Sequence, residues 1–309
     1  MNPSLIWNEI DAGEYAVHER NLGLKISQIG SVSWRRVRPF FYRPLYALQE
    51  IDPSVVSGPT ASLFGAFQHA VPAGGRTNSH LNYLIFDHPS VYSLADLNSE
   101  RRRRIKRATG VFAMKRMVDI GAFKQEAYPL YLDFVRRTGY AVGAHRQGAA
   151  GFAQWAENVF RLPGMVVLGA YRDGRLAGVS TSFRHKNTLF CATLICGADS
   201  LAHYLPDLML HVIRENAAQC RGITEIFPGM YHGNTSLDAF YFERGARILR
   251  KPAWLQINPI GRSVLNALRP GIIRRLLGEL TPEELKRATG KVEAHLLEKS
   301  EPVVDAARG

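Results

Sequence analysis

The sequence has little cysteine, no long apolar run and no compositionally biased tract in its 309 residues. Its apolar runs fall well short of the roughly 20 residues that a helix needs to span a bilayer. The N-terminal residues MNPSLIWNEIDAGE contain no basic segment leading into an apolar stretch, which is unlike a secretory signal. We therefore expect a cytoplasmic protein.

The three cysteines, Cys191, Cys196 and Cys220, form an odd set without C-x-x-C spacing and without a histidine pair nearby. This pattern is unlike a disulfide framework or a metal site, so we expect buried free thiols and no bound metal. Cys191 and Cys196 are five positions apart on a predicted strand. Strand alternation therefore predicts that they face opposite sides of the sheet.

Positive charge is in excess, with a formal net charge of +12. Such an excess favours a polyanionic partner, which can be a nucleic acid, an acidic membrane surface or a phosphate-bearing cosubstrate. A dense basic cluster spans residues 101–107, and a looser one spans residues 262–275. Aromatic residues do not interleave the first cluster, which is unlike a platform for single-stranded nucleic acid.

The second half of the chain predicts an antiparallel meander followed by helices and strands. Strands are expected at residues 165–171, 176–184 and 188–197, with the Asp173-Gly174 pair making a tight hairpin turn. A helix follows from Pro206 to Cys220 at helical spacing of apolar residues. A strand at 223–227 is expected to end at Pro228-Gly229, and a short helix from Leu237 precedes a last strand at 246–258.

The first half predicts helices at residues 94–109, 123–138 and 151–160, and strands at 24–29, 81–87 and 112–118. A strand, a polar loop, a helix, a glycine and a strand follow one another both from Ile85 and from Ile226, which suggests a duplication. Beyond Asn258, interrupted amphipathic helical turns are expected. Thr281-Pro282-Glu283-Glu284 has the composition of a capped helix start.

Two segments resemble known acyltransferases. Phe240-Tyr241-Phe242-Glu243-Arg244-Gly245-Ala246 is similar to the F-Y-x-x-x-G-[FA] segment that closes GNAT domains. The basic helix at 100–108 is similar to the R-R-x-I-R-K-A segment of Fem-type aminoacyl transferases. The resemblance covers about residues 82–258. It implies an α/β (α+β) GNAT-like fold with two tandem units, the second better preserved: a degenerate unit at 1–118, a catalytic unit at 119–258 and a helical tail at 259–309.

The segment from Ala198 to Asp207 departs from the pattern of GNAT enzymes that bind acyl-CoA. Those enzymes carry glycines here, whose backbone N–H groups hold a pyrophosphate, whereas this segment has none. Asp207 would also repel a diphosphate. We expect no tightly bound cofactor, with either acyl-CoA or aminoacyl-tRNA as cosubstrate. Tyr204 and Ser200 are the candidate donor-binding residues.

Three residues are candidates for catalysis. The resemblance places Tyr241 where many GNAT enzymes protonate the leaving group, although Tyr241 can equally be a core aromatic. Glu225, expected in mid-strand beside a splayed gap, is a candidate base or a solvent-facing residue. His232 follows a strand's C-terminal end, where α/β sheets place ligands, and is a second candidate base or an exposed loop histidine.

Tyr231 and Asn234, on the same loop as His232, are candidates for binding substrate. Arg101 and Arg104, on the basic helix, are candidates for binding the phosphates of a tRNA-like or nucleotide-bearing substrate. That helix can instead face anionic lipid or solvent.

The expected function is transfer of an acyl or aminoacyl group onto an amine acceptor. One alternative is a non-catalytic GNAT-like module for binding or peripheral membrane contact, and another is an acyl-CoA-dependent N-acetyltransferase of small molecules. No DNA partner is expected. The basic amphipathic tail at 262–277 either packs on the domain or lies on an anionic membrane, which would place the protein peripherally on the inner membrane surface.

Overall fold

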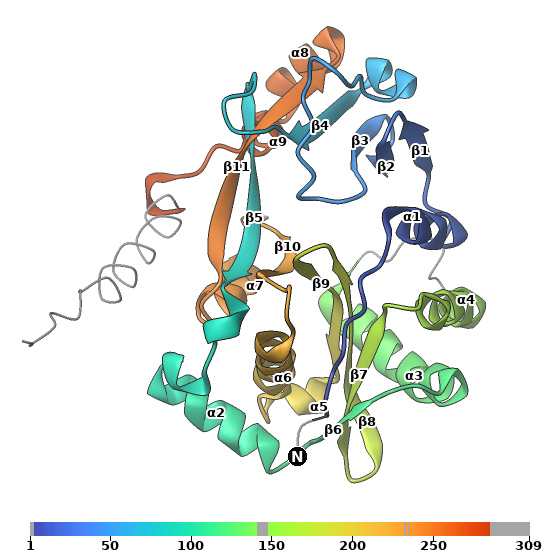
Figure 1. Cartoon of the computed structure of the whole chain (residues 1–309), viewed down its shortest axis with the longest axis vertical. Helices are drawn as coiled ribbons and strands as arrows, with labels where there is room; N and C mark the ends of the chain where they lie inside the picture. Colours follow the sequence, from blue (N-terminus) through green and yellow to red (C-terminus); the bar gives the residue numbers. More distant parts are fainter. Residues whose placement is uncertain (1–2, 141–147, 232, 234, 285–309) are drawn as a thin grey trace, which may run out of the picture.

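The chain folds around one large mixed sheet, and the computed structural model describes residues 3–140, 148–231, 233 and 235–284 (Figure 1). Within these residues eleven strands follow the order β1-β2-β3-β4-β11-β5-β10-β9-β8-β7-β6. The strands are β1 (Ile26–Ile29), β2 (Val32–Arg38), β3 (Phe41–Pro44), β4 (Ala66–Ala70), β5 (Ser79–Asp87), β6 (Ala113–Arg116), β7 (Val166–Arg172), β8 (Arg175–His185), β9 (Thr188–Cys196), β10 (Glu225–Met230) and β11 (Arg247–Ile257).

Helices cover the sheet and its ends. The α-helices are α1 (Ala12–Asn21), α2 (Ser99–Thr109), α3 (Ile120–Thr138), α4 (Gly148–Arg161), α5 (Ala198–Leu201), α6 (Leu205–Gln219), α7 (Thr235–Phe242), α8 (Pro259–Leu268) and α9 (Pro270–Leu277). Short 3-10 helices are η1 (Thr60–Phe64), η2 (Pro89–Val91) and η3 (Leu94–Asp96).

The strand order contains the same arrangement twice. β1, β2 and β3 form an antiparallel meander and β4 runs parallel to β3, just as β7, β8 and β9 form a meander and β10 runs parallel to β9. The strand that follows each set pairs with the other set: β5 pairs with β10, and β11 pairs with β4. We call β1–β5 the first unit and β7–β11 the second unit. The predicted α/β fold with two tandem GNAT-like units is confirmed.

In this strand order β10 corresponds to β4. The sequence comparison instead matched Ile226 on β10 with Ile85 on β5, so the suggested duplication is offset by one strand. β5 and β11 pair with each other at the centre of the sheet and join the two units. β6, which precedes residue 118, lies at the edge of the sheet beside β7. The boundaries at residues 118 and 258 stay a prediction.

The meander, α6, α7 and β11 lie where the sequence predicts them. The end of β10 was predicted wrongly, because the strand continues through Pro228 and Gly229 to Met230. Its register with β5 shifts between Ile226 and Gly229. A proline is tolerated at such an irregularity because the ladder there needs no N–H donor.

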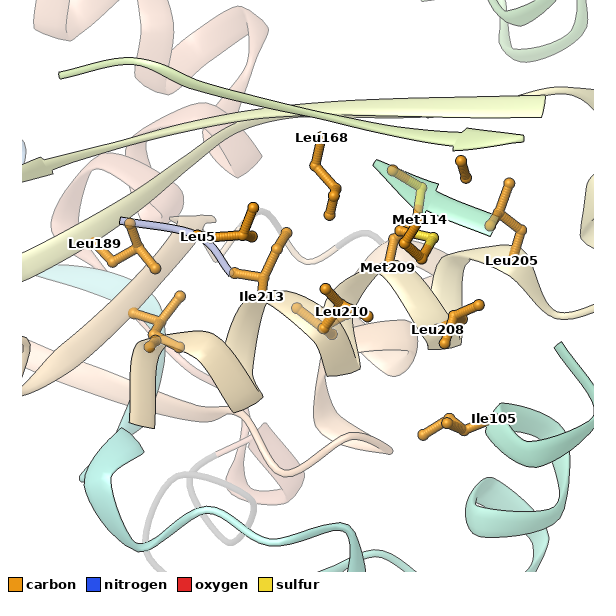
Figure 2. Close-up of a cluster of buried hydrophobic side chains, with 14 of the residues drawn as sticks. Leu5, Ile105, Met114, Leu168, Leu189, Leu205, Leu208, Met209, Leu210 and Ile213 are labelled. Atoms are coloured by element: carbon orange, nitrogen blue, oxygen red, sulfur yellow. The ribbon is translucent and has the colours of Figure 1, made fainter. Parts of the chain in front are cut away.

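α6 is buried between the sheet and α2. Figure 2 shows Leu205, Met209 and Ile213 on the side of α6 that faces the strands, and Ile105 of α2 on the opposite side. A helix that is apolar on both sides needs cover on both sides. The basic helix α2 provides that cover through Ile105 and Ala108.

Both Cys191 and Cys196 pack against this same core cluster, so the expectation of opposite faces was wrong. The reason is a β-bulge. Thr181 pairs with Thr193 while Ser182 pairs with Cys191, which leaves Ala192 without a partner on β8. One extra residue reverses the alternation between the two cysteines.

The C-terminal segment forms the interrupted helical turns that the sequence predicts. Asn258 caps α8 through its side-chain oxygen, and Arg269 separates α8 from α9. Thr281 and Glu284 then cap each other's backbone N–H groups, at 2.7 and 3.3 Å, which confirms the predicted helix start. None of the helices in the described ranges is long and apolar enough to cross a membrane.

Candidate active site

β9 and β10 separate after three paired positions, and we call this place the second junction. The pairs run from Glu225 with Thr188 to Phe227 with Phe190. Beyond them β10 stays with β5, whereas β9 follows β8 to Cys196. The junction therefore opens toward the C-terminal ends of both strands, where α/β sheets place ligands. Ala192 is exposed there although it lies inside the sheet.

Tyr241, on α7, lies beside this junction. Its ring lies 6.3 Å from that of Phe86 on β5, centroid to centroid. Burial and the neighbouring thiol of Cys191 on β9 raise the pKa of Tyr241 well above its usual range, and Arg244 offsets part of the effect. The phenol is consequently protonated at neutral pH and offers an O–H donor, although the higher pKa makes it a weaker acid than a free tyrosine.

Cys191 lies just beyond the last pair of β9 with β10. Burial raises the pKa of its thiol to about 12. A nucleophilic cysteine needs a thiolate, and so Cys191 is unsuited to covalent catalysis at neutral pH.

Glu225 does not lie where the sequence predicts it. It is the first residue of β10, at the closed end of the second junction and not in mid-strand beside the gap. Its Oε1 atom accepts a hydrogen bond of 2.5 Å from the Thr188 hydroxyl. This position gives no support to the predicted role as base, and that role stays a prediction.

Asp207, in the first turn of α6, is neutralised by two buried arginines. The Arg244 guanidinium lies 2.7 Å from its Oδ1 atom and that of Arg101 lies 3.3 Å away. Arg101 also pairs with Glu243. Asp207 therefore does not present a free negative charge at the start of α6. Arg101 is buried, and its candidate role in binding substrate phosphates stays a prediction.

Arg104 and Tyr204 come together at the start of α6. The guanidinium carbon of Arg104 lies 5.0 Å from the centroid of the Tyr204 ring, and that of Arg107 lies 5.8 Å away. Tyr204 itself precedes α6 in a left-handed backbone conformation, with φ of 61°. Ser200 is buried and donates its hydroxyl to the Gly197 carbonyl at 2.6 Å, so that oxygen already has a local partner.

Tyr231 follows β10 and lies at the open end of the second junction. Its backbone N–H donates to the Asn82 carbonyl at 3.0 Å, and its hydroxyl donates to Glu284. The C-terminal segment therefore reaches the loop that carries the predicted binding residues. His232 and Asn234 lie outside the described residues, so their roles stay predictions.

Three features of this region were not found from the sequence. They are the bulge at Ala192, the proximity of Cys191 to Tyr241 and the pairing of Asp207 with two arginines. Each depends on a strand register or on contacts between distant segments. Among the residues that the structure places, no three His, Cys, Asp or Glu side chains gather as a metal site would require.

Solved structures share this fold. FemX matches with a TM-score of 0.56 at 9% identity over 82% of this chain and 93% of that one. L-PGS from Bacillus licheniformis matches with a TM-score of 0.53 at 12% identity over 89% and 98%. The C-terminal domain of a protein described as a lysylphosphatidylglycerol synthetase from Agrobacterium fabrum matches with a TM-score of 0.52 at 11% identity over 82% and 89%.

The likeness to the Fem-type branch of GNAT-like proteins is thereby confirmed at the level of the fold. No protein-family model and no curated protein sequence matches this chain.

Proposed function

We propose that this protein transfers an acyl or aminoacyl group onto an amine at the second junction. The observation that carries the proposal is the position of Tyr241, a neutral phenol near Cys191, the residue just beyond the last pair of β9 with β10. The fold it shares with FemX and with lysylphosphatidylglycerol synthetase domains supports an acyl-transfer role.

The chemistry follows from this geometry. The amine attacks the carbonyl carbon of the donor, and the bond to the leaving group breaks. Tyr241 gives its proton to that leaving group, a thiolate for CoA or a ribose oxygen for tRNA. Main-chain groups near Ala192, where the bulge interrupts the ladder with β8, are the candidates for stabilising the oxyanion. The attacking amine nitrogen becomes positively charged and releases its proton to water, and Tyr241 regains a proton from water after the leaving group departs.

The donor is either aminoacyl-tRNA or acyl-CoA. The glycine-free turn before α6 disfavours a CoA pyrophosphate site. The Agrobacterium fabrum domain belongs to a protein described as a lysylphosphatidylglycerol synthetase, whose product would carry a lysyl group, and this also favours an aminoacyl donor. Because Asp207 is neutralised, electrostatic repulsion does not argue against either donor.

A donor-consumption assay tests the proposal. The purified chain is incubated with radiolabelled acetyl-CoA in one series and with tRNA charged with radiolabelled amino acids in another, each with a mixture of small amines. We expect consumption of one donor above the buffer rate. Tyr241→Phe should lower that rate about 10²- to 10⁴-fold, the usual contribution of a general acid.

Tyr171→Phe is the matched control, since Tyr171 is a partly buried phenol on β7, outside the second junction. It should retain the wild-type rate. Equal rates for Tyr241→Phe and Tyr171→Phe would rule out Tyr241 as the acid, and binding of a donor without its consumption would favour the non-catalytic module.

A further inference from the structure

An apolar and basic surface lies at the end of the molecule where α8 and η1 meet. Asn258, which caps α8, donates its backbone N–H to the Gly65 carbonyl and its side-chain amide to the Leu63 carbonyl, both at 2.7 Å. Phe64 of η1 in turn contacts Phe40, the turn residue between β2 and β3, at 6.3 Å between ring centroids. Figure 1 shows α8 and the short light-blue helix η1 at the top of the view.

The outer face of α8 is apolar instead of polar. Ile260, Val264 and Leu268 recur every fourth residue and are 76%, 50% and 73% exposed. Their spacing puts them on one side of the helix. A helix that packs on a domain normally turns its apolar stripe inward. None of the residues of α8 is buried, so this stripe is not part of the core.

Neighbouring elements extend the patch. Phe64 is 76% exposed and Leu63 is 56% exposed on η1, and Phe40 is half exposed beside them. Large apolar side chains exposed together mark interaction sites, whereas single ones are ordinary. We call the set Phe40, Leu63, Phe64, Ile260, Val264 and Leu268 the α8 surface.

Charge around the α8 surface is predominantly positive, and exposed Glu279 lies 3.9 Å from Arg274 at its margin. Arg262, Arg269, Arg274 and Arg275 are exposed on α8, α9 and the turn between them. The sequence has no Asp or Glu at residues 20–49, 53–86 or 244–278, which supply the strands and helices at this end of the molecule. A second copy of the chain, docked face to face, would bring these like charges together. A layer of anionic headgroups over apolar chains complements both features.

We propose that the α8 surface docks this protein on an anionic lipid membrane. α8 lies in the plane of the interface, with Ile260, Val264 and Leu268 among the acyl chains and the arginines at the headgroups. The proposal stands independently of the transfer activity, because none of its residues belongs to the second junction.

Vesicle flotation of the full chain tests this docking. The probes are vesicles of phosphatidylcholine alone and of equal parts phosphatidylcholine and phosphatidylglycerol, at low salt. We expect flotation with the anionic vesicles only. The double variant Ile260→Ser/Leu268→Ser should lower the partition constant about tenfold or more, because two aliphatic side chains no longer enter the interface. Higher salt should weaken binding of the wild type.

Two matched control variants distinguish docking through the α8 surface from non-specific adsorption to vesicles. Val91→Ser/Val118→Ser removes two valines that are 60% and 76% exposed elsewhere. Arg103→Gln/Lys106→Gln removes two exposed charges from α2, the denser basic cluster. Both controls should float as the wild type does, and circular dichroism should show the same folded spectrum for every variant.

Three results would overturn the proposal. The first is no flotation of the wild type with anionic vesicles at low salt. The second is that the α2 variant no longer floats while the α8 variant floats as the wild type does, which would assign binding to α2. The third is a wild-type dimer that Ile260→Ser/Leu268→Ser dissociates while vesicle binding is unchanged, which would make the α8 surface a contact between two copies.

Discussion

The two units share a parallel strand junction, yet the two junctions differ in what occupies them. At the first junction β3 and β4 pair at Phe41 with Ala66 and at Tyr42 with Phe67. Beyond these pairs the side chain of Arg43 reaches the amide oxygen of Gln68 at 2.7 Å and also contacts the Met230 sulfur. Every residue of β4 is buried. Protein therefore fills the first junction.

At the second junction β10, the counterpart of β4, is buried at only two of its six residues. β9, the counterpart of β3, exposes Ala192 and half-exposes the residues on either side of it. A neutral phenol, Tyr241, lies near the adjacent residue Cys191. The duplicated strand order thus carries one junction that protein side chains fill and one at which a strand residue, Ala192, is exposed. The difference teaches that a repeated fold does not repeat a function, because the function depends on the side chains at the junction.

The charges near the two junctions are also balanced differently. Arg43 has neutral partners, and burial lowers its pKa. Arg101 and Arg244 instead share the carboxylate of Asp207, with all three side chains less than a tenth exposed. Replacing one of these buried charged residues should consequently lower the free energy of unfolding more near the second junction than near the first.

The largest expected effect on stability is that of Asp207→Ala. It leaves Arg101 and Arg244 buried with only the exposed carboxylate of Glu243 as a partner. Removing one partner of a buried ion pair typically costs about 3–5 kcal/mol. Chemical denaturation should show this loss in the free energy of unfolding. Glu100→Ala, which removes an exposed partner of Arg103 and Arg104, is the control and should leave the unfolding midpoint close to that of the wild type. Equal effects of the two substitutions would contradict the description of a buried ion network.

Arg43→Met should have the next effect, a loss of about 1–3 kcal/mol, because the amide oxygen of fully buried Gln68 then lacks its donor. The same denaturation experiment measures it. Since Arg43 belongs to the filled junction, the transfer rate per folded molecule should stay unchanged. A fall in that rate comparable to the effect of Tyr241→Phe would place the first junction in the reaction and end the contrast between the units.

The smallest effect is expected for Arg104→Gln/Arg107→Gln. Both guanidinium groups lie over the Tyr204 ring at the start of α6, where they can attract donor phosphates. The donor KM should rise a few-fold with kcat unchanged, and more at low salt than at high salt. Arg103→Gln, an exposed change on the same helix, is the matched control. A lower kcat with constant KM would argue that these arginines position the chemistry and not the donor.

The sequence predicted the second unit better than the first for physical reasons. β7, β8 and β9 are joined by tight turns and are rich in apolar residues, so local signals define them. β2 reads VSWRRVR and β4 reads AFQHA, and neither shows clear alternation of polar and apolar residues. β4 is buried on both faces, and five residues are too few to reveal a strand without that pattern.

The candidate site was predicted only in part. Tyr241 could be found because the segment from Phe240 to Ala246 carries a local resemblance. Glu225 was placed wrongly, since the point where two strands separate depends on their register and not on either sequence alone. The bulge at Ala192 escaped prediction for the same reason, as did the exchange of β5 and β11 between the units.

The most direct test of this account is donor binding to Ala192→Phe, measured by calorimetry with whichever donor the consumption assay identifies. Ala192 is exposed, so a large side chain there should leave folding intact while filling the second junction. We predict a wild-type unfolding midpoint together with loss of both donor binding and transfer. Ala192→Phe that binds and transfers the donor as the wild type does would contradict the claim that the second junction is the active site.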